Sequence, residues 1–199
     1  LGGHRQRPGI DYDETYAPVV SWPVVRLFLI FFVLNRWATR QLDFVLAYPQ
    51  AKVERDMYMS IPQGFAYQGS RGSHVLKILQ NIYGSCQAGR TWYLHATKYL
   101  KGLGFNQSTV DPCVFFYQGG VLLLYVDDVI LGGPTIDHVE AMIELIQDNV
   151  DAEDQGDMND FLGVQVKQLP DGSLELSQPH LIKSILNDLR LGDESKQAS

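Results

Sequence analysis

The stretch Val121-Leu-Leu-Leu-Tyr-Val-Asp-Asp-Val-Ile-Leu131 places two adjacent aspartates between two apolar segments. Runs of Val, Ile and Leu of this length are typical of strands buried in a sheet. Burying a carboxylate without a partner is costly, so Asp127 and Asp128 conflict with their surroundings. A bound divalent cation would remove this conflict. The alternative is a plain hairpin turn, because Asp is common in turns.

A third carboxylate stands in a similar position earlier in the chain. Gln41-Leu-Asp-Phe-Val45 has the pattern of a short strand, and Asp43 is a charge inside it. Three oxygen donors on adjacent strands suit magnesium, which takes its remaining ligands from water and phosphates. The chemistry served by such a site is in-line displacement at phosphorus, with two metal ions roughly 3.5–4 Å apart. The sequence therefore predicts that Asp43, Asp127 and Asp128 form a catalytic metal site.

Around these carboxylates the chain alternates helical and strand patterns. Gly119-Gly120 is expected as a two-residue turn between strands at 114–117 and 121–126. Apolar spacing predicts helices at 23–39, 90–103, 137–150 and 179–191, strands at 41–45, 129–131 and 161–166, and a hairpin at 169–176. Loop with short strands is expected at 47–65, and a polar insert at 67–73. This order predicts an α+β fold, a split βαβ arrangement with helices on one face of an antiparallel sheet.

Composition limits the classes of protein. With 199 residues, 45% of them hydrophobic, the chain can bury one substantial core. Two cysteines are too few for a disulfide framework. The most apolar run, at 27–34, is well short of the roughly 20 residues that cross a bilayer, so no membrane partner is expected.

The net charge of −7 by itself argues against a nucleic-acid partner, because Lys and Arg supply most of the affinity for phosphates. The charge is unevenly divided, however. Residues 1–102 hold 12 Lys and Arg against 6 Asp and Glu, whereas residues 103–199 hold 4 against 17. A basic half can face a polyanion while an acidic half supplies metal ligands and solvated helix faces.

Two motifs resemble those of a known family. Tyr125-Val-Asp-Asp128 matches the Tyr-x-Asp-Asp signature of reverse transcriptases, and Asp43-Phe-Val-Leu-Ala-Tyr48 resembles the Asp-x-x-x-Ala-Phe/Tyr motif that carries their first metal aspartate. Five further stretches are similar, in the same order, to motifs of copia-type LTR retrotransposons: Arg7-Pro-Gly-Ile-Asp-Tyr-Asp-Glu-Thr-Tyr-Ala-Pro-Val19, Met57-Tyr-Met-Ser-Ile-Pro-Gln-Gly-Phe65, Ile82-Tyr-Gly-Ser-Cys-Gln-Ala-Gly-Arg-Thr-Trp92, Asp111-Pro-Cys-Val114 and Phe161-Leu-Gly163. The likeness covers essentially the whole chain. It departs from the family pattern at Ser21, Ser85, Cys86 and Gly89, where Arg, Leu, Lys and Pro are usual.

The resemblance implies the right-hand palm of a reverse transcriptase, with a ferredoxin-like split βαβ core, in one truncated domain of a Gag-Pol polyprotein spanning 1–199. It assigns 1–18 to a remnant of the fingers, 19–53 and 82–166 to the palm, 54–81 to a fingers-like insert, and 167–199 to the primer-grip hairpin and the start of the thumb. A preceding basic finger segment, most of the thumb and any RNase H domain are expected to lie outside this sequence.

The resemblance also implies roles for particular residues. Asp43 and Asp127 would be the principal metal ligands, with Asp128 as a third carboxylate and Phe44 contributing its backbone carbonyl. The nucleotide pocket would be lined by Tyr48, Tyr83 and Gln87, and the ring of Tyr48 would exclude a 2′-hydroxyl. The primer and template would contact Arg90, Tyr125, Phe161, Leu162 and Gly163.

Several of these residues have a purely structural alternative. Tyr48 could be a core aromatic, and Arg90 a solvated helix residue. Trp92 and Tyr93 are expected to be helix core, although aromatic rings do stack on nucleic-acid bases.

The function implied is an RNA-directed DNA polymerase core that uses two Mg²⁺ ions, or Mn²⁺ in their place. Its substrates would be deoxynucleoside triphosphates and a primer on an RNA or DNA template. Integrase and RNase H regions of the same polyprotein would be its partners, and a cytoplasmic virus-like particle or the nucleus its location. Two alternatives stay open: an inactive retrotransposon remnant that retains the palm fold, and an unrelated α+β binding module with a coincidental Asp-Asp turn. The second would place Asp43 more than about 10 Å from Asp127, because carboxylates that share a metal must converge.

Overall fold

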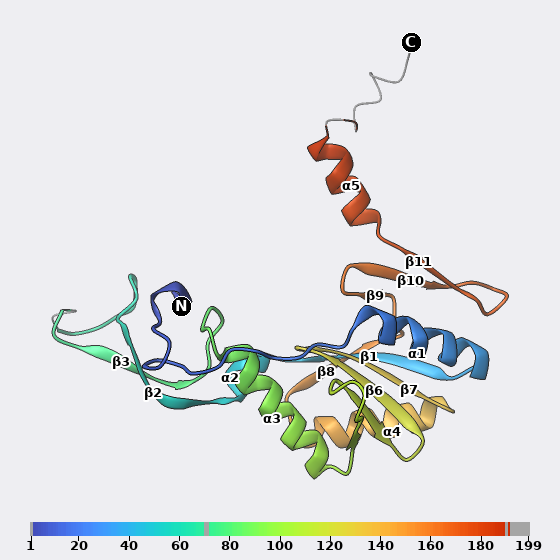
Figure 1. The fold of residues 1–199 in the computed structure, drawn as a ribbon, viewed down its shortest axis with the longest axis horizontal. Coiled ribbons are helices and arrows are strands. Elements are labelled where there is room, and N and C mark those ends of the chain that lie inside the picture. The colour runs from blue at the N-terminus through green and yellow to red at the C-terminus, as the bar shows by residue number, and fades with distance from the viewer. Residues whose placement is uncertain (1, 70–71, 190, 192–199) are drawn as a thin grey trace.

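The computed structural model describes residues 2–69, 72–189 and 191, and combines helices with antiparallel sheets (Figure 1). Its helices are the short 3-10 helix η1 (Gly3–Arg5), α1 (Trp22–Asn35), α2 (Ala47–Gln50), α3 (Ala88–Gly102), α4 (Ile136–Gln147) and α5 (Pro179–Asp188). Its strands are β1 (Ala38–Phe44), β2 (Lys52–Ser60), β3 (Val75–Gln80), β4 (Asn106–Gln107), β5 (Val114–Tyr117), β6 (Gly120–Tyr125), β7 (Asp128–Gly133), β8 (Ala152–Gly156), β9 (Asp160–Phe161), β10 (Val164–Gln168) and β11 (Leu174–Ser177).

The largest sheet has the order β4-β5-β6-β7-β1-β8, and every neighbouring pair is antiparallel. Strands β1 and β6 both pair with β7, so they run in the same direction with β7 between them. The connection from β1 to β6 contains α3, and α4 connects β7 to β8. This is the order that a split βαβ arrangement requires. The apolar stretches 121–124 and 129–131 occupy its centre, where their side chains are almost fully buried.

Helices cover both faces of this sheet. A Cβ atom built on Gly132 would lie 2.4 Å from the ring of Phe32 in α1, whereas one built on the next residue, Gly133, would lie 2.8 Å from His138 in α4. Successive residues of a strand face opposite sides, so α1 and α4 lie on opposite faces. Helix α3 shares the face of α4, because the hydroxyl of Tyr99 donates to the carbonyl of Ile146 at 2.6 Å. The predicted single helical layer is therefore wrong for α1, whose apolar residues are spread all round the helix and do not indicate which face it covers.

Several predicted boundaries also need correction. Helix α1 ends at Asn35, where Arg36 takes a left-handed conformation (φ 54°), and the last predicted helical residues already belong to β1. The hairpin turn is Gln118-Gly119 rather than Gly119-Gly120. Both turn residues have positive φ, as in a type I′ turn, and Gly120 is paired with Tyr117.

Strands β3, β4 and β8 were not predicted, and β2 is longer than the short strands that were expected. Within 47–65, expected as loop with short strands, residues 52–60 form one long strand, β2, which pairs with β3 in a two-stranded sheet. Strand β8 consists of Ala-Glu-Asp-Gln-Gly and lies at the edge of the main sheet, beside β1. An edge strand has one neighbour only and tolerates charged side chains, so it lacks the apolar alternation by which strands are recognised.

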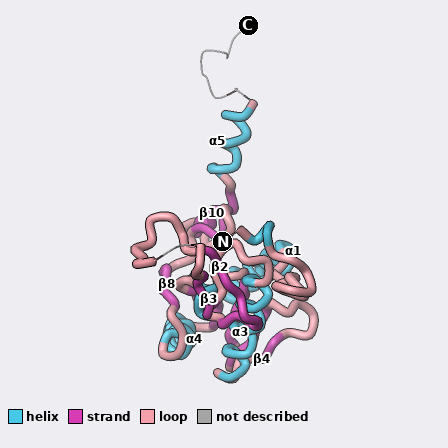
Figure 2. The backbone as a smooth tube through the Cα atoms, turned by 90° about the vertical axis from the view of Figure 1, so that its left-hand side faces the viewer, coloured by secondary structure: helices cyan, strands magenta, loops and turns pink. Residues whose placement is uncertain are grey.

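The C-terminal part forms a three-stranded sheet, β9, β10 and β11, followed by α5. Helix α5 extends away from the rest of the molecule and has no buried residue (Figures 1 and 2). The predicted helix at 179–191 ends earlier, at Asp188, and position 190 is outside the described residues. Positions 70–71 of the polar insert and 192–199 of the proposed thumb segment are also outside them. Among the described helices, none has the length and apolar character that crossing a membrane needs.

Candidate functional site

Strand pairing brings the predicted carboxylates together. Asp43 at the end of β1 lies directly opposite Asp128 at the start of β7. The amide of Phe44 donates to the carbonyl of Asp127 at 2.9 Å, which makes Asp43 and Asp128 a non-hydrogen-bonded pair. Cα atoms in such a pair are about 4.5 Å apart, and the two side chains point to the same face. Asp127 adjoins both, so the separation that would favour an unrelated binding module is not found.

The turn between β6 and β7 consists of Val126 and Asp127. Val126 has φ 57°, and the strand residues Tyr125 and Asp128 that flank the turn are paired. A positive φ at the first turn residue only is the type II′ pattern, which favours glycine. A β-branched residue in this conformation is strained by about 1–3 kcal/mol, so surrounding contacts must hold the turn in place.

The electrostatics of the site are those of crowded carboxylates. Burial raises the pKa of Asp43, and the charges of Asp127 and Glu153 raise it further. Burial likewise raises the pKa of Asp128, helped by Asp127, Asp43 and Asp160 and partly opposed by a hydrogen bond with Gln41. Both causes, burial and neighbouring negative charge, disfavour the charged form of these carboxyls. The site is therefore prepared to accept positive charge.

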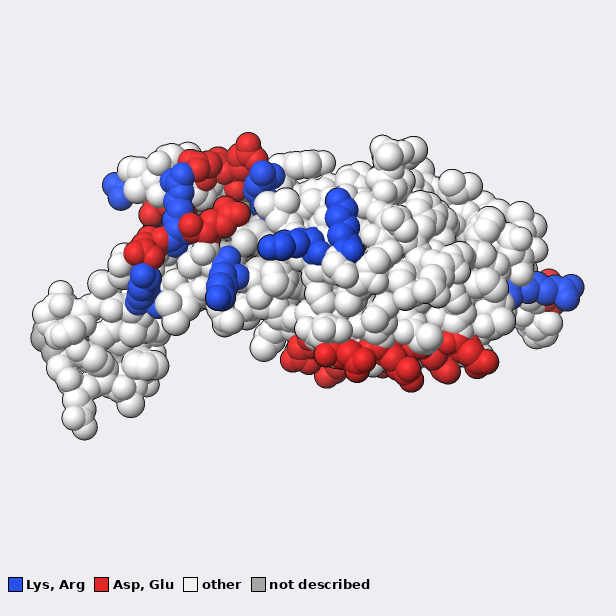
Figure 3. Space-filling model, turned by 90° about the horizontal axis from the view of Figure 1, so that it is seen from below, with Lys and Arg blue, Asp and Glu red and all other residues white. Residues whose placement is uncertain are grey.

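The carboxylates face away from the acidic side of the molecule. Phe44 packs edge-on against Trp92 of α3 at 5.1 Å, so Asp43, one residue earlier, points to the opposite face of the sheet. On the α3 and α4 side, exposed acidic side chains form a band where α4 lies, and basic side chains lie toward α3 (Figure 3). A polyanion would be repelled by that band (Figure 3), and the half-buried Asp43, Asp127 and Asp128 lie on the other face of the sheet.

Two tyrosines lie beside the carboxylates. The rings of Tyr48 and Tyr83 are 4.6 Å apart and tilted by 39°. Burial is the largest cause of the raised pKa of each phenol, and the charge of Asp127 adds to it in both. Tyr48 therefore lies close enough to Asp127 to feel its charge, and Tyr83 packs against Tyr48.

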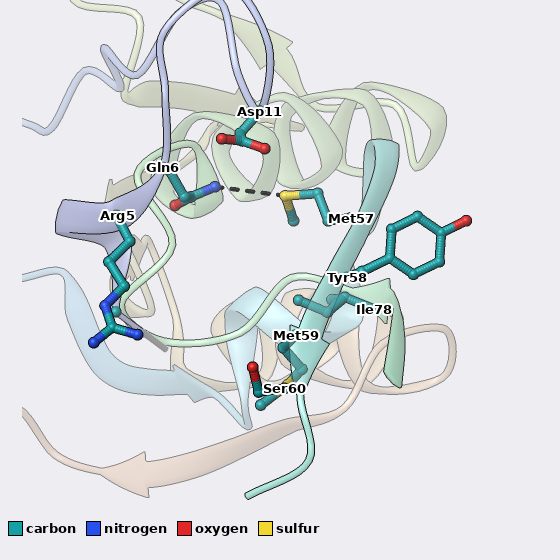
Figure 4. Close-up of a pocket in the computed structure, with 9 residues that line it drawn as sticks. Arg5, Gln6, Asp11, Met57, Tyr58, Met59, Ser60 and Ile78 are labelled. Carbon is teal, nitrogen blue, oxygen red and sulfur yellow. Dashed lines mark hydrogen bonds between the residues drawn. The ribbon is translucent and has the colours of Figure 1, made fainter. Parts of the chain in front are cut away.

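Gln87 takes a more buried position than its predicted role requires. Its side chain is only 5% exposed, its carbonyl oxygen accepts from Gln6 at 3.0 Å, and its amide nitrogen lies 3.1 Å from the sulfur of Met57. Gln6 also accepts from the amide of Cys86 at 2.8 Å. Figure 4 shows Gln6 and Met57 at a pocket formed by the N-terminal segment and the β2–β3 hairpin. Gln87 thus joins the N-terminal segment to this hairpin.

The residues predicted to contact primer and template fall into two places. Arg90 forms an ion pair with Glu14 at 2.6 Å and donates to the carbonyl of Tyr16, so its guanidinium is engaged by the N-terminal segment. Phe161 is 1% exposed and its ring packs against Tyr125 at 6.5 Å. Leu162 and Gly163 both have positive φ and form the turn between β9 and β10.

The sequence prediction missed one carboxylate at this site. Glu153 in β8 lies directly opposite Asp43, on the side away from Asp128, so the three acids form a row across β7, β1 and β8. Nothing in the local sequence signalled this position, because β8 itself was not predicted.

The donor chemistry of the site fits a divalent cation, since magnesium prefers carboxylate oxygens. The carboxylates of Asp43, Asp127 and Asp128 do not form a preformed metal cage. Within the part of the chain that the structure describes, no group of three or more His, Cys, Asp or Glu side chains is placed to hold a metal ion. Repulsion between neighbouring carboxylates opposes closer approach when no cation lies between them.

Known proteins are similar to this chain over most of its length. A family model described as "Reverse transcriptase (RNA-dependent DNA polymerase)" matches residues 1–199. The Retrovirus-related Pol polyproteins from transposons RE1 and RE2 of Arabidopsis thaliana are 36% and 35% identical to this chain, over 92% and 88% of it. That from transposon TNT 1-94 of Nicotiana tabacum is 30% identical over 92% of the chain. The matches span only 13%, 12% and 14% of these much longer relatives. The chain belongs to the reverse transcriptase (RNA-dependent DNA polymerase) family, among the copia-type retrotransposon Pol polyproteins.

Proposed function

We propose that this chain is the template-directed nucleotidyl-transfer core of a copia-type reverse transcriptase. The observation that carries the proposal is the register of β1 and β7, which sets Asp43 opposite Asp128 and beside Asp127. Three carboxylates with few counter-charges are costly to a fold unless they serve a cation. Membership of the family supports the reaction class, and the geometry supports the choice of residues.

Asp43 and Asp127 would hold the metal, with Asp128 and the backbone carbonyl of Phe44 completing the site. Bound magnesium, or manganese in its place, would neutralise the triphosphate and activate the attacking primer hydroxyl. The chain's own contribution is positioning. The β1–β7 pair fixes the spacing of the carboxylates, and the half-buried setting of the aspartates strengthens their electrostatic effect.

The incoming deoxynucleotide would lie against the Tyr48–Tyr83 pair. A ring beneath the sugar leaves no room for a 2′-hydroxyl, which supports a preference for deoxynucleotides. Gln87 would act mainly through its neighbours, because its amide groups are engaged by Gln6 and Met57. Tyr125 and the β9–β10 turn would lie nearest the primer, with Leu162 and Gly163 contacting it through backbone because the Phe161 ring is buried.

The same proposal divides the chain along its sheets. The six-stranded sheet with α1, α3 and α4 would be the palm, and the β2–β3 hairpin with the N-terminal segment would be the fingers part. The β9–β10–β11 sheet would be the primer grip, and α5 would begin the thumb. In the whole polyprotein, integrase and RNase H regions would work with this core, in a cytoplasmic virus-like particle or the nucleus.

Primer extension with the purified chain and Mg²⁺ tests the proposal. The expected result is deoxynucleotide addition that Asp127→Asn reduces by a factor of 100 or more, since a catalytic metal ligand is lost. Asp137→Asn, on the α4 face, is the matched control and leaves extension unchanged. Extension that survives Asp127→Asn would refute the metal assignment.

A non-catalytic remnant is the second candidate, favoured by the lack of a preformed metal group among the described residues. Thermal stabilisation by Mg²⁺ separates the two. An intact site that binds the ion raises the melting temperature of the wild type and not of Asp127→Asn. A wild type that neither extends primers nor responds to Mg²⁺ would be such a remnant.

A further inference from the structure

Trp92 is the largest of the fully buried side chains and lies on α3, at 1% exposure. Its burial agrees with the prediction that it is helix core. Its indole nitrogen is nevertheless a donor that must find an acceptor inside the protein. The acceptor is the backbone carbonyl of Val126, at 2.6 Å.

Val126 is the strained residue of the turn that carries Asp127. The strand pairs end at Tyr125 and Asp128, so the carbonyl of Val126 lies beyond the ladder and depends on a partner from elsewhere. Trp92 supplies that partner from a separate element, 34 residues earlier in the chain. A strained turn persists only where surrounding contacts hold it.

The same indole also touches the other carboxylate-bearing strand. Its ring meets the ring of Phe44 edge-on, at 5.1 Å and 71°. Phe44 follows Asp43 directly, and its amide donates to the carbonyl of Asp127. Trp92 therefore contacts the segments that bear Asp43 and Asp127 at the same time.

From these contacts we propose that Trp92 is a positioning residue, which sets the Val126-Asp127 turn against β1 and so fixes the spacing of the carboxylates. The inference rests on the proposed function, because the spacing matters only if the carboxylates share a cation. A phenylalanine would fill most of the same volume and keep the contact with Phe44. It would leave the carbonyl of Val126 without its donor.

Trp92→Phe is the test variant, and Trp37→Phe is its matched control. Trp37 packs against Phe31 and Phe32 of α1, away from the turn. In amide hydrogen exchange without metal, Trp92→Phe should speed exchange at the Phe44 amide by roughly fivefold, the effect of losing one hydrogen bond. Amides near Leu122 and Leu131, in the middle of the β6–β7 pair, should change much less, and Trp37→Phe should not single out Phe44.

The metal response supplies the second readout. The rise in melting temperature that Mg²⁺ produces in the wild type should shrink by half or more in Trp92→Phe and stay intact in Trp37→Phe. A residue with a merely structural role would lower the melting temperature equally with and without Mg²⁺. If the Phe44 amide and the Mg²⁺ response both match the wild type, the inference is overturned.

Val126→Gly provides a rescue. Glycine adopts positive φ without strain, so the turn should need Trp92 less. In a double-mutant cycle, Trp92→Phe should alter the Phe44 amide clearly less in the Val126→Gly background than alone. Equal effects in both backgrounds would contradict the inference. A wild type without any Mg²⁺ response would refute the proposed function instead, and the exchange measurements would still decide the role of Trp92.

Discussion

Replacing Asp43 with asparagine should make the folded chain more stable than the wild type when no metal is present. With saturating Mg²⁺ the variant should be less stable than the wild type. Asp43 lies between Asp128 and Glu153 in the row of acids across three strands. The substitution keeps the shape of the side chain and removes its charge. Like charges placed directly opposite each other in a sheet are destabilising, so the metal-free fold should gain.

The size of this gain follows from the strand pairing. Side chains in a directly opposed pair begin about 5 Å apart. At that distance two unit charges repel by roughly 3 kcal/mol at an effective dielectric constant of about 20, and by about 0.8 kcal/mol in water. Asp43 and Asp128 are half-buried, and salt screens them further, so a gain of about 1 kcal/mol is expected. For a chain of this length, that is about 2–4 °C in melting temperature.

The pH dependence has a definite sign. Folding raises the pKa of Asp43 and Asp128, so the folded chain holds these protons more strongly than the unfolded chain does. This contribution to stability is complete below the ordinary aspartate pKa of about 3.9 and is lost as pH rises through the folded pKa. Asp43→Asn should therefore be more stable than the wild type at pH 7, and the difference should shrink as pH falls toward 4.

Thermal melts at pH 7 and near pH 4, each with and without Mg²⁺, make the measurement. Saturating Mg²⁺ should raise the wild type above Asp43→Asn, because binding to the folded state adds stability that the variant lacks. The matched control is Glu175→Gln, an exposed acid on β11, and it should show neither effect. An Asp43→Asn variant that is less stable at pH 7 without metal, or one whose gain is the same at both pH values, would refute the account of a repulsive carboxylate row.

Three further predictions concern the fold. Gly132→Ala should lower the free energy of unfolding, measured by thermal melts, by about 1–3 kcal/mol, because the added Cβ would lie 2.4 Å from the buried Phe32 ring. The control Gly102→Ala, whose Cβ would meet no atom within 4 Å, should be neutral or stabilising. Cys113 is 0% exposed, and burial raises the pKa of its thiol to about 12, so a thiol reagent at pH 8 should modify Cys113 only after unfolding. Rapid labelling of Cys113 in the folded chain would contradict this packing. Tyr99→Phe should lower stability by about 1 kcal/mol, since its hydroxyl donates to Ile146 at 2.6 Å, and an unchanged melt would show that this bond between α3 and α4 contributes nothing.

The sequence predicted most of the centre of the fold and little of its edges. The strands at 114–117, 121–125 and 129–131 are apolar enough to be recognised, and they occupy the middle of the sheet. Strand β8 carries acidic residues at the sheet edge, so its pattern resembles loop. The position of α1 on the second face was equally hidden, because a helix that is apolar all round can pack on either side.

For the site, the sequence predicted which carboxylates lie together but not which distant residues contact them. The pairing of Asp43 with Asp128 followed from two strands that could each be recognised, and the structure places them opposite each other. The burial of Gln87 depends on Gln6, which lies 81 residues away. Glu153 joined the row only through a strand whose sequence gave no sign of it. Contacts between distant segments are set by tertiary packing, and no local pattern records them.

The turn itself shows why a motif and its support have to be considered together. An Asp-Asp pair alone most simply indicates a turn. Here Asp127 does lie in a turn, after Val126, whose backbone conformation favours glycine. What makes this turn chemically useful is the alignment of Asp127 and Asp128 with Asp43 across β1 and β7. That alignment has two destabilising features, a strained backbone at Val126 and repulsion between the carboxylates. A bound cation can relieve the repulsion between the carboxylates but not the backbone strain at Val126. That strain has to be offset by packing contacts, and the hydrogen bond from the buried Trp92 to the carbonyl of Val126 is such a contact.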